Sequence, residues 1–248
     1  MRWLRPLIIM ACLLAVWQVI VWVTGVQPFI LPGPGAVLVT LAERYDTILS
    51  HAWVTGLEIL LGLALGTLLG VATALAMAAI KGATRWLLPV LVASQAVPVF
   101  AIAPLLVLWL DYGMTSKVAM ATLIIYFPVT AAFFDGLRRT SPEWLEIAQT
   151  MGASRLAILR HLRIPAALPN LASGLRVAAS VAPIGAVVGE WVGSEAGLGY
   201  LMLHANARMQ VDLMFAALFV LTLGAVALYF TLDWALKRLI PWQPETLK

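Results

Sequence analysis

The sequence predicts an all-α membrane protein with six transmembrane helices and one cytoplasmic helix–turn–helix loop. Of its 248 residues, 62% are hydrophobic and only 11% are charged, whereas a soluble domain carries about 25% charged residues. Apolar stretches of the length that crosses a bilayer recur along the chain. This composition excludes an ordinary cytosolic enzyme, a disordered chain and a nucleic-acid-binding protein. The single cysteine, Cys12, excludes an intrachain disulfide and a cysteine-based metal site.

Six segments have the roughly 20 mostly apolar residues that a spanning helix needs. They are residues 6–26, 56–80, 86–110, 118–135, 171–193 and 213–236. The first resembles a signal peptide because Arg2 and Arg5 precede it, but its apolar run exceeds the roughly 7–15 residues of such a peptide. We therefore expect a retained anchor and one membrane domain over residues 1–248.

Lysine and arginine are distributed unequally between the two sides of this topology. With both termini in the cytoplasm, twelve of them lie inside and three outside, and cytoplasmic loops carry the excess of positive charge. The inner set is Arg2, Arg5, Lys81, Arg85, Arg138, Arg139, Arg155, Arg160, Arg163, Lys237, Arg238 and Lys248; the outer set is Arg44, Lys117 and Arg208. We therefore predict that both termini are cytoplasmic.

The outer segment 27–55 and the second span each carry a helical pattern. Apolar residues recur at helical spacing from Val37 to Ala52, which predicts a short helix that lies in the outer interface or packs under the spans. Gly62, Gly66 and Gly70 lie four residues apart on one face. Small residues at this spacing allow close helix contact in lipid, either within the subunit or between subunits.

The third span is interrupted by polar residues and prolines. Ser94, Gln95, Pro98 and Pro104 break its apolar run. A proline frees the carbonyl four residues earlier, here those of Ser94 and Phe100, and freed groups at membrane depth need protein or a watery cavity. One such proline alone indicates a kink. Because prolines also interrupt spans four and five, the pattern favours a translocation pathway that includes Ser94, Gln95, Pro98 and Phe100.

Two ionisable residues lie in the fifth span. Arg176 and Glu190 are 14 residues apart, roughly 21 Å along a helix, so they cannot pair within one subunit. Intramembrane charges are costly and indicate function unless they reach the headgroups. Arg176 and Glu190 are therefore candidates for the pathway or its gates, with a place near the headgroups as the alternative.

Residues 136–170 form the one large inner loop, and the first half predicts a helix. Ser141 followed by Pro142 is a typical helix start, and Gly152 supplies a left-handed stop. An apolar stripe runs along the helix through Trp144, Leu145, Ala148 and Met151. Such a stripe can insert into a groove of a partner protein.

A second helix completes this loop. Ser154 can cap it, its residues run from Arg155 to Arg163, and Pro165 is expected to end it. The loop is therefore predicted to be a helix–glycine turn–helix held just outside the membrane.

This loop resembles the EAA loop of ABC-importer permeases. Glu146-Ile147-Ala148, three residues, Gly152, nine residues and Leu162-Arg163-Ile164-Pro165 follow the family pattern Glu-Ala-Ala, three residues, Gly, nine residues, Ile-x-Leu-Pro, with mild substitutions. The resemblance implies the type I ABC-importer permease fold, in which this loop docks on a cytoplasmic ATPase subunit. It implies ATPase-coupling roles for Trp144, Glu146, Ala148, Met151, Gly152 and Pro165.

Two further segments resemble the nitrate/sulfonate/taurine branch of these permeases. They are Leu31-Pro32-Gly33-Pro34 and the stretch from Gly189-Glu190-Trp191 to Gly197-Leu198-Gly199-Tyr200. Glu58 stands where the branch often has Arg. Within the branch, residues 94–100 and 185–191 look most like permeases for thiamine pyrimidine precursors, such as hydroxymethylpyrimidine.

The resemblance implies a machine of several parts in a bacterial inner membrane. The chain has no Gly-x-x-x-x-Gly-Lys-Ser/Thr phosphate loop, so it is expected to be non-catalytic and to hold no cofactor, while a partner ATPase binds ATP and Mg²⁺. We expect a homodimer, two ATPase subunits, a periplasmic or lipid-anchored binding protein and inward movement of a small polar solute.

Other functions remain as alternatives. The same machine could carry a sulfonate, taurine or nitrate. A secondary transporter or channel would leave the docking loop unexplained, and an intramembrane enzyme would need catalytic residues that converge, whereas His51, His161 and His204 fall in loops or at interfaces.

Overall fold

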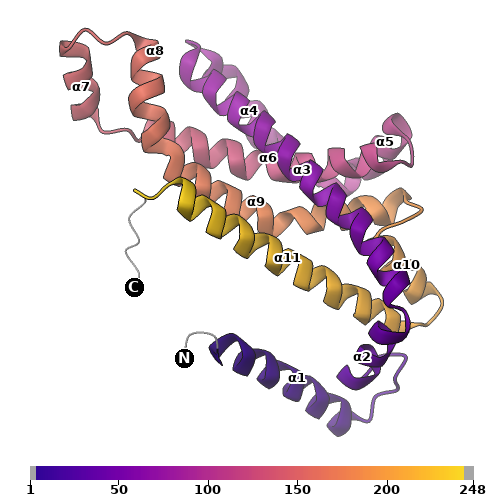
Figure 1. Ribbon diagram of the computed structural model, residues 1–248. Helices are drawn as coiled ribbons and strands as arrows, with labels where there is room; N and C mark the ends of the chain where they lie inside the picture. The colour runs from indigo at the N-terminus through magenta and orange to yellow at the C-terminus, as the bar shows by residue number, and fades with distance from the viewer. Residues whose placement is uncertain (1–3, 243–248) are drawn as a thin grey trace.

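The protein is a bundle of α-helices of very different lengths (Figure 1). The computed structural model describes residues 4–242, with side chains from residue 8 onward, and that part contains no strand. The helices are α1 (Leu4–Thr24), α2 (Pro34–Glu43), α3 (Tyr45–Ala79), α4 (Ala83–Ala96), α5 (Val99–Leu110), α6 (Met114–Arg138), α7 (Pro142–Thr150), α8 (Arg155–Ile158), the π-helical turn η1 (Leu159–Arg163), α9 (Ile164–Gly193), α10 (Leu198–Ala207) and α11 (Val211–Leu239).

Within residues 8–242, four helical segments are long and apolar enough to cross a membrane. They are Tyr45–Ala79, Met114–Arg138, Arg155–Gly193 and Val211–Leu239. The α4–α5 pair is bent by 98° and counts as a fifth span if the two helices cross together. The part of α1 whose side chains are described, Ile8–Thr24, is a shorter apolar helix. The predicted span at residues 6–26 therefore stays a prediction.

The outer helix predicted between 27 and 55 has a different form. Only α2 is separate, whereas the rest of the pattern belongs to α3, which starts at Tyr45 instead of residue 56. A helix of 35 residues is about 52 Å long, which exceeds the roughly 30 Å hydrocarbon core. The apolar residues before position 56 therefore extend the second span beyond the bilayer core.

Small residues hold α3, α6 and α9 together at the centre of the molecule. Gly62, Gly66 and Gly70 all face α6, so this glycine face serves packing within the subunit. A Cβ atom at Gly66 would lie 2.6 Å from Cγ2 of Ile125, and one at Gly174 of α9 would lie 2.8 Å from the Pro128 carbonyl oxygen. Ile125 itself is fully buried. Close backbone contact replaces the hydrophobic driving force that is absent in lipid.

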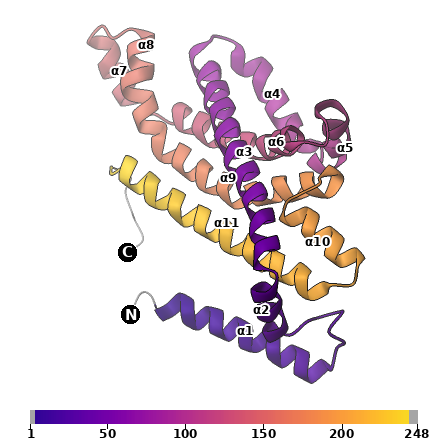
Figure 2. The ribbon, with the colours of Figure 1, turned by 45° about the vertical axis from the view of Figure 1, so that its right-hand side comes forward.

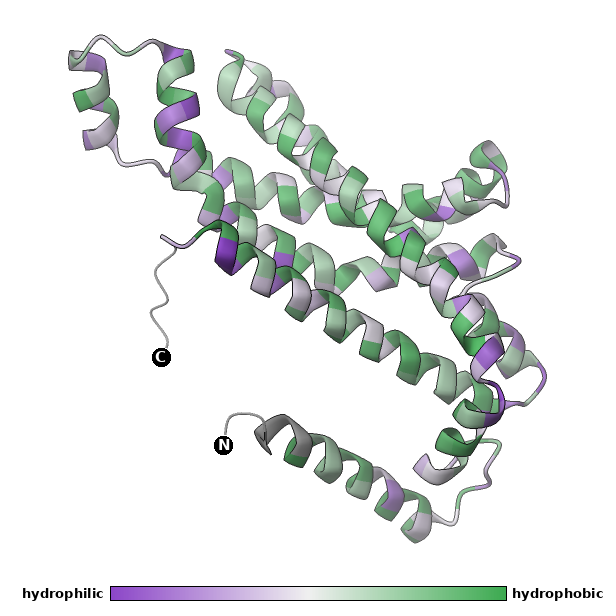
Figure 3. Cartoon of the chain, in the orientation of Figure 1, coloured by the Kyte–Doolittle hydropathy of each residue, from purple (hydrophilic) through white to green (hydrophobic). Residues whose placement is uncertain are grey.

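The connections between the long helices fall at two opposite ends (Figures 1 and 2). The α3–α4 turn and the α7–α8 pair lie toward one end, on the same side as the start of α1 and the end of α11. The α5–α6 loop and α10 lie toward the other. Hydrophilic residues gather at both ends, and the helices between them are mainly hydrophobic (Figure 3). We call these the α7 end and the α10 end.

Some of the charges assigned to the two sides can be checked in the structure. Arg2 and Lys248 lie outside the described residues, as does the side chain of Arg5. Lys117, which the sequence places among the three outer charges, is only 1% exposed in the first turn of α6. Its ammonium group donates hydrogen bonds to the carbonyl oxygens of Tyr112 and Gly113.

Candidate functional site

The loop between α6 and α9 projects from the bundle at the α7 end (Figures 1 and 2). The α7 helix ends in a Schellman motif: the Gly152 N–H donates to the Gln149 carbonyl at 2.9 Å, and the Ala153 N–H donates to the Ala148 carbonyl at 2.9 Å. Gly152 has φ +76°, as predicted for a left-handed stop. This turn folds α7 back alongside α8.

The start of each loop helix differs in its capping. Ser154 accepts a hydrogen bond from the Ala157 N–H at 3.2 Å, which confirms it as the cap of α8. Ser141 does occupy the N-cap position of α7 and Pro142 its first turn, as predicted, but the Ser141 side chain makes no cap hydrogen bond. The fixed φ of proline suits that position without a side-chain cap.

The predicted apolar stripe of α7 divides between two faces. Trp144 is 53% exposed and Met151 is 81% exposed, together with Ile147 and the neighbouring Leu156 of α8. Ala148 is buried against its own chain, which corrects its predicted contact with a partner. Glu146 is exposed. The outer surface of the loop therefore combines large apolar side chains with an acidic residue.

Pro165 does not end the second loop helix, contrary to the prediction. The helix runs without interruption from Arg155 to Gly193, and Pro165 lies in the first turn of α9. The turn before it, Leu159–Arg163, is π-helical, and this wider turn surrounds the carbonyl that a proline ring would strike in a regular α-helix. The loop is therefore joined rigidly to the membrane helix that follows.

The polar residues of the third span lie at the break between α4 and α5. The α4 helix ends at Ala96, Pro98 precedes α5, and the two helices meet at 98°. Gln95 and Phe100 are exposed on the surface of the subunit, while the Ser94 hydroxyl donates to the Leu91 carbonyl at 2.7 Å. The structure thus brings four of the predicted pathway residues to one exposed elbow.

Arg176 lies elsewhere and is paired. Its Nε donates to Oδ1 of Asp233 in α11 at 2.7 Å, and the Asp233 carboxylate also lies 3.2 Å from the Lys237 ammonium group. An intramembrane charge is tolerated when it is paired in this way. The structure therefore assigns Arg176 to the contact between α9 and α11 rather than to the elbow.

Glu190 is also separate from the elbow, in a buried cluster at the α10 end. Glu190 is 1% exposed. Its Oε1 accepts a hydrogen bond from the Thr55 hydroxyl at 2.6 Å, and its Oε2 accepts hydrogen bonds from the backbone N–H groups of Gly199 and Tyr200. The prediction that Glu190 lines an open pathway does not hold in this subunit, because the carboxylate is enclosed by α3 and α10.

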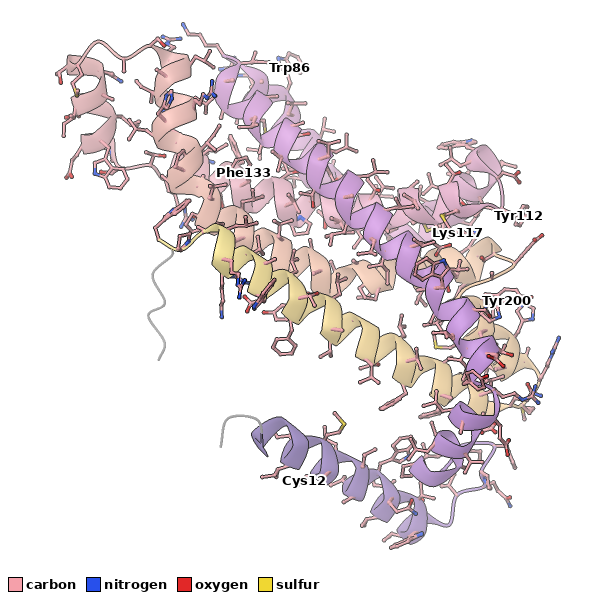
Figure 4. All side chains as sticks on the ribbon, in the orientation of Figure 1. Cys12, Trp86, Tyr112, Lys117, Phe133 and Tyr200 are labelled. Carbon is pink, nitrogen blue, oxygen red and sulfur yellow. The ribbon has the colours of Figure 1, made fainter. Side chains whose placement is uncertain are left out.

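Further residues complete what we call the Glu190 cluster, which consists of Thr55, Glu58, Lys117, Glu190 and the N-terminal backbone of α10. Glu58 and Lys117 are each 1% exposed, and the Glu58 carboxyl group lies in contact with Glu190. The Leu198 N–H donates to the Thr55 hydroxyl at 2.7 Å. Lys117 and Tyr200 lie at the same end of the molecule in Figure 4. Four helices, α3, α6, α9 and the start of α10, therefore meet in one polar core.

Thr55 was not predicted from the sequence, and Lys117 was predicted only as a charge on the outer side. The spacing of Gly197 and Gly199 in the sequence was a partial signal for the Glu190 cluster. A Cβ atom at either position would collide with the Glu190 carboxylate, within 2.7 Å of its Oε2 in the case of Gly199. A Gly-x-Gly pair shortly after a membrane carboxylate therefore indicates a backbone that approaches that carboxylate.

Residues 62–243 match the family model described as the binding-protein-dependent transport system inner membrane component. The chain belongs to this family. It is thus the permease component of an ABC importer, a non-catalytic membrane subunit that works with ATPase subunits and a binding protein. The Haemophilus influenzae protein named as a probable ABC transporter permease is 56% identical over 96% of this permease and 98% of its own length.

Two other similarities bear on the branch and the fold. The Halalkalibacterium halodurans formylaminopyrimidine transport permease ThiX is 34% identical and covers 98% of this permease and 97% of its own chain. Further relatives, 28–36% identical, are named as riboflavin, aliphatic-sulfonate and taurine permeases. A structure of the MetNI methionine ABC transporter has a TM-score of 0.68 at 16% identity over 79% of this permease and 97% of that chain. The fold is therefore that of an ABC-importer permease.

Proposed function

We propose that two copies of this permease enclose one route for a thiamine pyrimidine precursor and that two ATPase subunits bind their α7–α8 loops. The observation that carries the coupling role is the exposed apolar and acidic surface of α7 on a loop that continues rigidly into α9. Closure of the ATPases on ATP and Mg²⁺ would move that loop, and with it α9. ATP shifts the equilibrium between the two conformations of the route because the ATPases make different contacts with each of them.

The elbow between α4 and α5 supports the homodimer. Trp86, Phe100, Leu108 and Trp109 are each at least 60% exposed on this pair of helices. Backbone groups at a helix break within the membrane need protein or water around them. A second copy facing the elbow would cover the apolar side chains and leave Ser94 and Gln95 beside a central route.

The proposed substrate rests on the branch and on the chemistry of the elbow. Among the relatives, ThiX matches nearly the full length of both chains. An amide at Gln95 can hydrogen-bond a heterocycle, and the Phe100 ring can stack on a flat one. Taurine, an alkyl sulfonate and nitrate each contain an anionic group, and the elbow offers no cationic side chain among residues 94–100.

The substrate is tested by transport. The permease, its ATPase and its binding protein are reconstituted in proteoliposomes, and uptake of hydroxymethylpyrimidine, formylaminopyrimidine, taurine and an alkyl sulfonate is measured with ATP. We expect uptake of a pyrimidine only. Uptake of a sulfonate without a pyrimidine would overturn the substrate, and uptake without the ATPase would overturn the coupled mechanism.

The coupling role is tested by Glu146→Lys. Reversing this exposed charge should reduce co-purification of the ATPase and abolish ATP-driven uptake, because the acidic side chain is at the centre of the proposed contact surface. The matched control is Glu195→Lys, the same change at an exposed site near the α10 end, which should leave ATPase co-purification intact. Normal co-purification with Glu146→Lys would contradict the role of α7.

A further inference from the structure

A cavity of about 520 Å³ lies at the α7 end between the α7–α8 loop, here called the coupling loop, and the turn that joins α3 to α4. Its volume falls within the range of small-molecule sites, about 300–1,000 Å³. It is lined by residues 77–82 and Thr84 on one side and by Leu145, Gln149, Arg155, Leu156, Ile158, Leu159 and Arg163 on the other. The cavity therefore lies between the coupling loop and the end of α3, one of the membrane helices.

The charges that line this cavity all have one sign. Lys81, Arg155 and Arg163 contribute three cations, and no carboxylate is among the lining residues. Within residues 8–242, none of these three side chains takes part in a hydrogen bond or an ion pair, and Nε of Arg163 is buried without a partner. A buried guanidinium donor without an acceptor costs free energy, so the arrangement favours an anion in the cavity.

The local backbone helps to place these cations together. Arg163 ends the π-helical turn η1, and Arg155 begins α8 on the same continuous helix. Single π turns are rare and are frequently found at functional sites. Lys81 approaches from the α3–α4 turn, on the opposite wall. One anion between these walls would connect two segments that the covalent chain joins only through α4, α5, α6 and α7.

The lining also limits the chemistry of the occupant. Two guanidinium groups match the fork geometry of phosphate oxygens, whereas Met77, Leu145, Leu156 and Ile158 offer an apolar wall. Inorganic phosphate alone would leave much of this volume empty. We propose that the cavity binds a phosphate group attached to a partly apolar body, supplied by an anionic phospholipid headgroup or by a free phosphorylated metabolite.

The test uses the assembled transporter with its ATPase. The complex is placed in nanodiscs of phosphatidylcholine, with the nucleotide sites saturated by a non-hydrolysable ATP analogue, so that added phosphate groups act elsewhere. One arm replaces part of the lipid with phosphatidylglycerol, and the other adds glycerol 3-phosphate as the free probe. The readout is amide hydrogen exchange of residues 80–84 and 155–163.

We expect exchange of both segments to slow by about tenfold in one of the two arms, the effect of about one charge-assisted hydrogen bond on local opening. Slowing with phosphatidylglycerol identifies the lipid as the source, and slowing with glycerol 3-phosphate identifies the free metabolite. No slowing in either arm overturns the proposal, including the case in which an acidic side chain of the ATPase already fills the cavity.

Variants tie the effect to this cavity. Arg155→Gln with Arg163→Gln should abolish the slowing, and Lys81→Gln, at an exposed turn where folding is not at risk, should weaken it. The matched control is Arg85→Gln, the same loss of charge at an exposed position that does not line the cavity. An unchanged response in the Arg155/Arg163 variant, or an equal loss in the Arg85 control, would overturn the proposal.

Discussion

Thr55 acts as a link between α3, α9 and α10. Its hydroxyl donates to Glu190 and accepts the N–H of Leu198. Beside it, the Gly197 N–H donates to Nδ1 of His51 at 2.9 Å. The first N–H groups of a helix have no partner within that helix, so α3 and Glu190 together satisfy the buried start of α10.

At the residue scale, we predict that Thr55→Val loosens α10. Valine keeps the shape but leaves the buried Leu198 N–H and one Glu190 oxygen without partners, which should cost about 1–3 kcal/mol of unfolding free energy. The measurement is thermal unfolding in detergent, combined with limited proteolysis of the 194–197 loop. Thr231→Val is the control, since Thr231 is exposed and bonds only to carbonyls of its own helix. Equal stability of the two variants would argue against the link.

At the scale of elements, the contact of α6 with α3 and α9 depends on residues without side chains. Gly62, Gly66 and Gly70 allow α3 to approach α6, and Gly174 and Gly185 allow α9 to approach it from another side. The coupling loop is preceded by α6 and followed by α9. Both of its ends are therefore anchored in this packed centre. A movement of the loop is therefore transmitted to a rigid unit.

Gly66→Ala tests this packing. The added methyl group would meet Ile125 at 2.6 Å, and overpacking of a close helix contact typically costs about 1–3 kcal/mol. Gly224→Ala is the matched control, because a Cβ atom there meets nothing within 4 Å. We expect a lower thermal unfolding temperature in detergent for the Gly66 variant alone. A drop in both variants would show that helix flexibility, rather than contact, sets stability.

At the scale of the whole molecule, the two polar ends determine which partner each can meet. The coupling loop lies at the α7 end, and the Glu190 cluster and α10 lie at the other (Figures 1 and 4). Most of the cations outside the spans belong to the α7 end, and such an excess marks the cytoplasmic side. We propose that the α7 end faces the ATPases and that the α10 end faces the binding protein.

This orientation predicts the labelling of single cysteines. In a Cys12→Ser background, Thr150→Cys on α7 should react with a membrane-impermeant thiol reagent only after the cells are opened. Glu195→Cys, before α10, should react in spheroplasts. Both positions are exposed, so a difference in reactivity reports sidedness. Reaction of Thr150→Cys in intact spheroplasts would reverse the topology and remove the coupling role of the loop.

Local signals in the sequence were sufficient for much of the candidate site. Gly152 could be predicted as a left-handed stop because φ at such a turn depends on that residue itself, and the exposed Trp144, Glu146 and Met151 follow from helical periodicity. Ala148 could not be placed, because its burial depends on how α7 lies against its own chain. Pro165 was misjudged because the π turn before it is not visible in the residue pattern.

The sequence by itself determined the membrane class, most of the spans and the coupling loop, because hydropathy, charge bias and turn chemistry act over short stretches of chain. Only the tertiary structure decided which charges meet. Thr55 and Glu190 are 135 residues apart, and Arg176 and Asp233 are 57 apart, so no local pattern pairs them. In lipid a polar group must find an internal partner, and which partner it finds depends on how the helices pack.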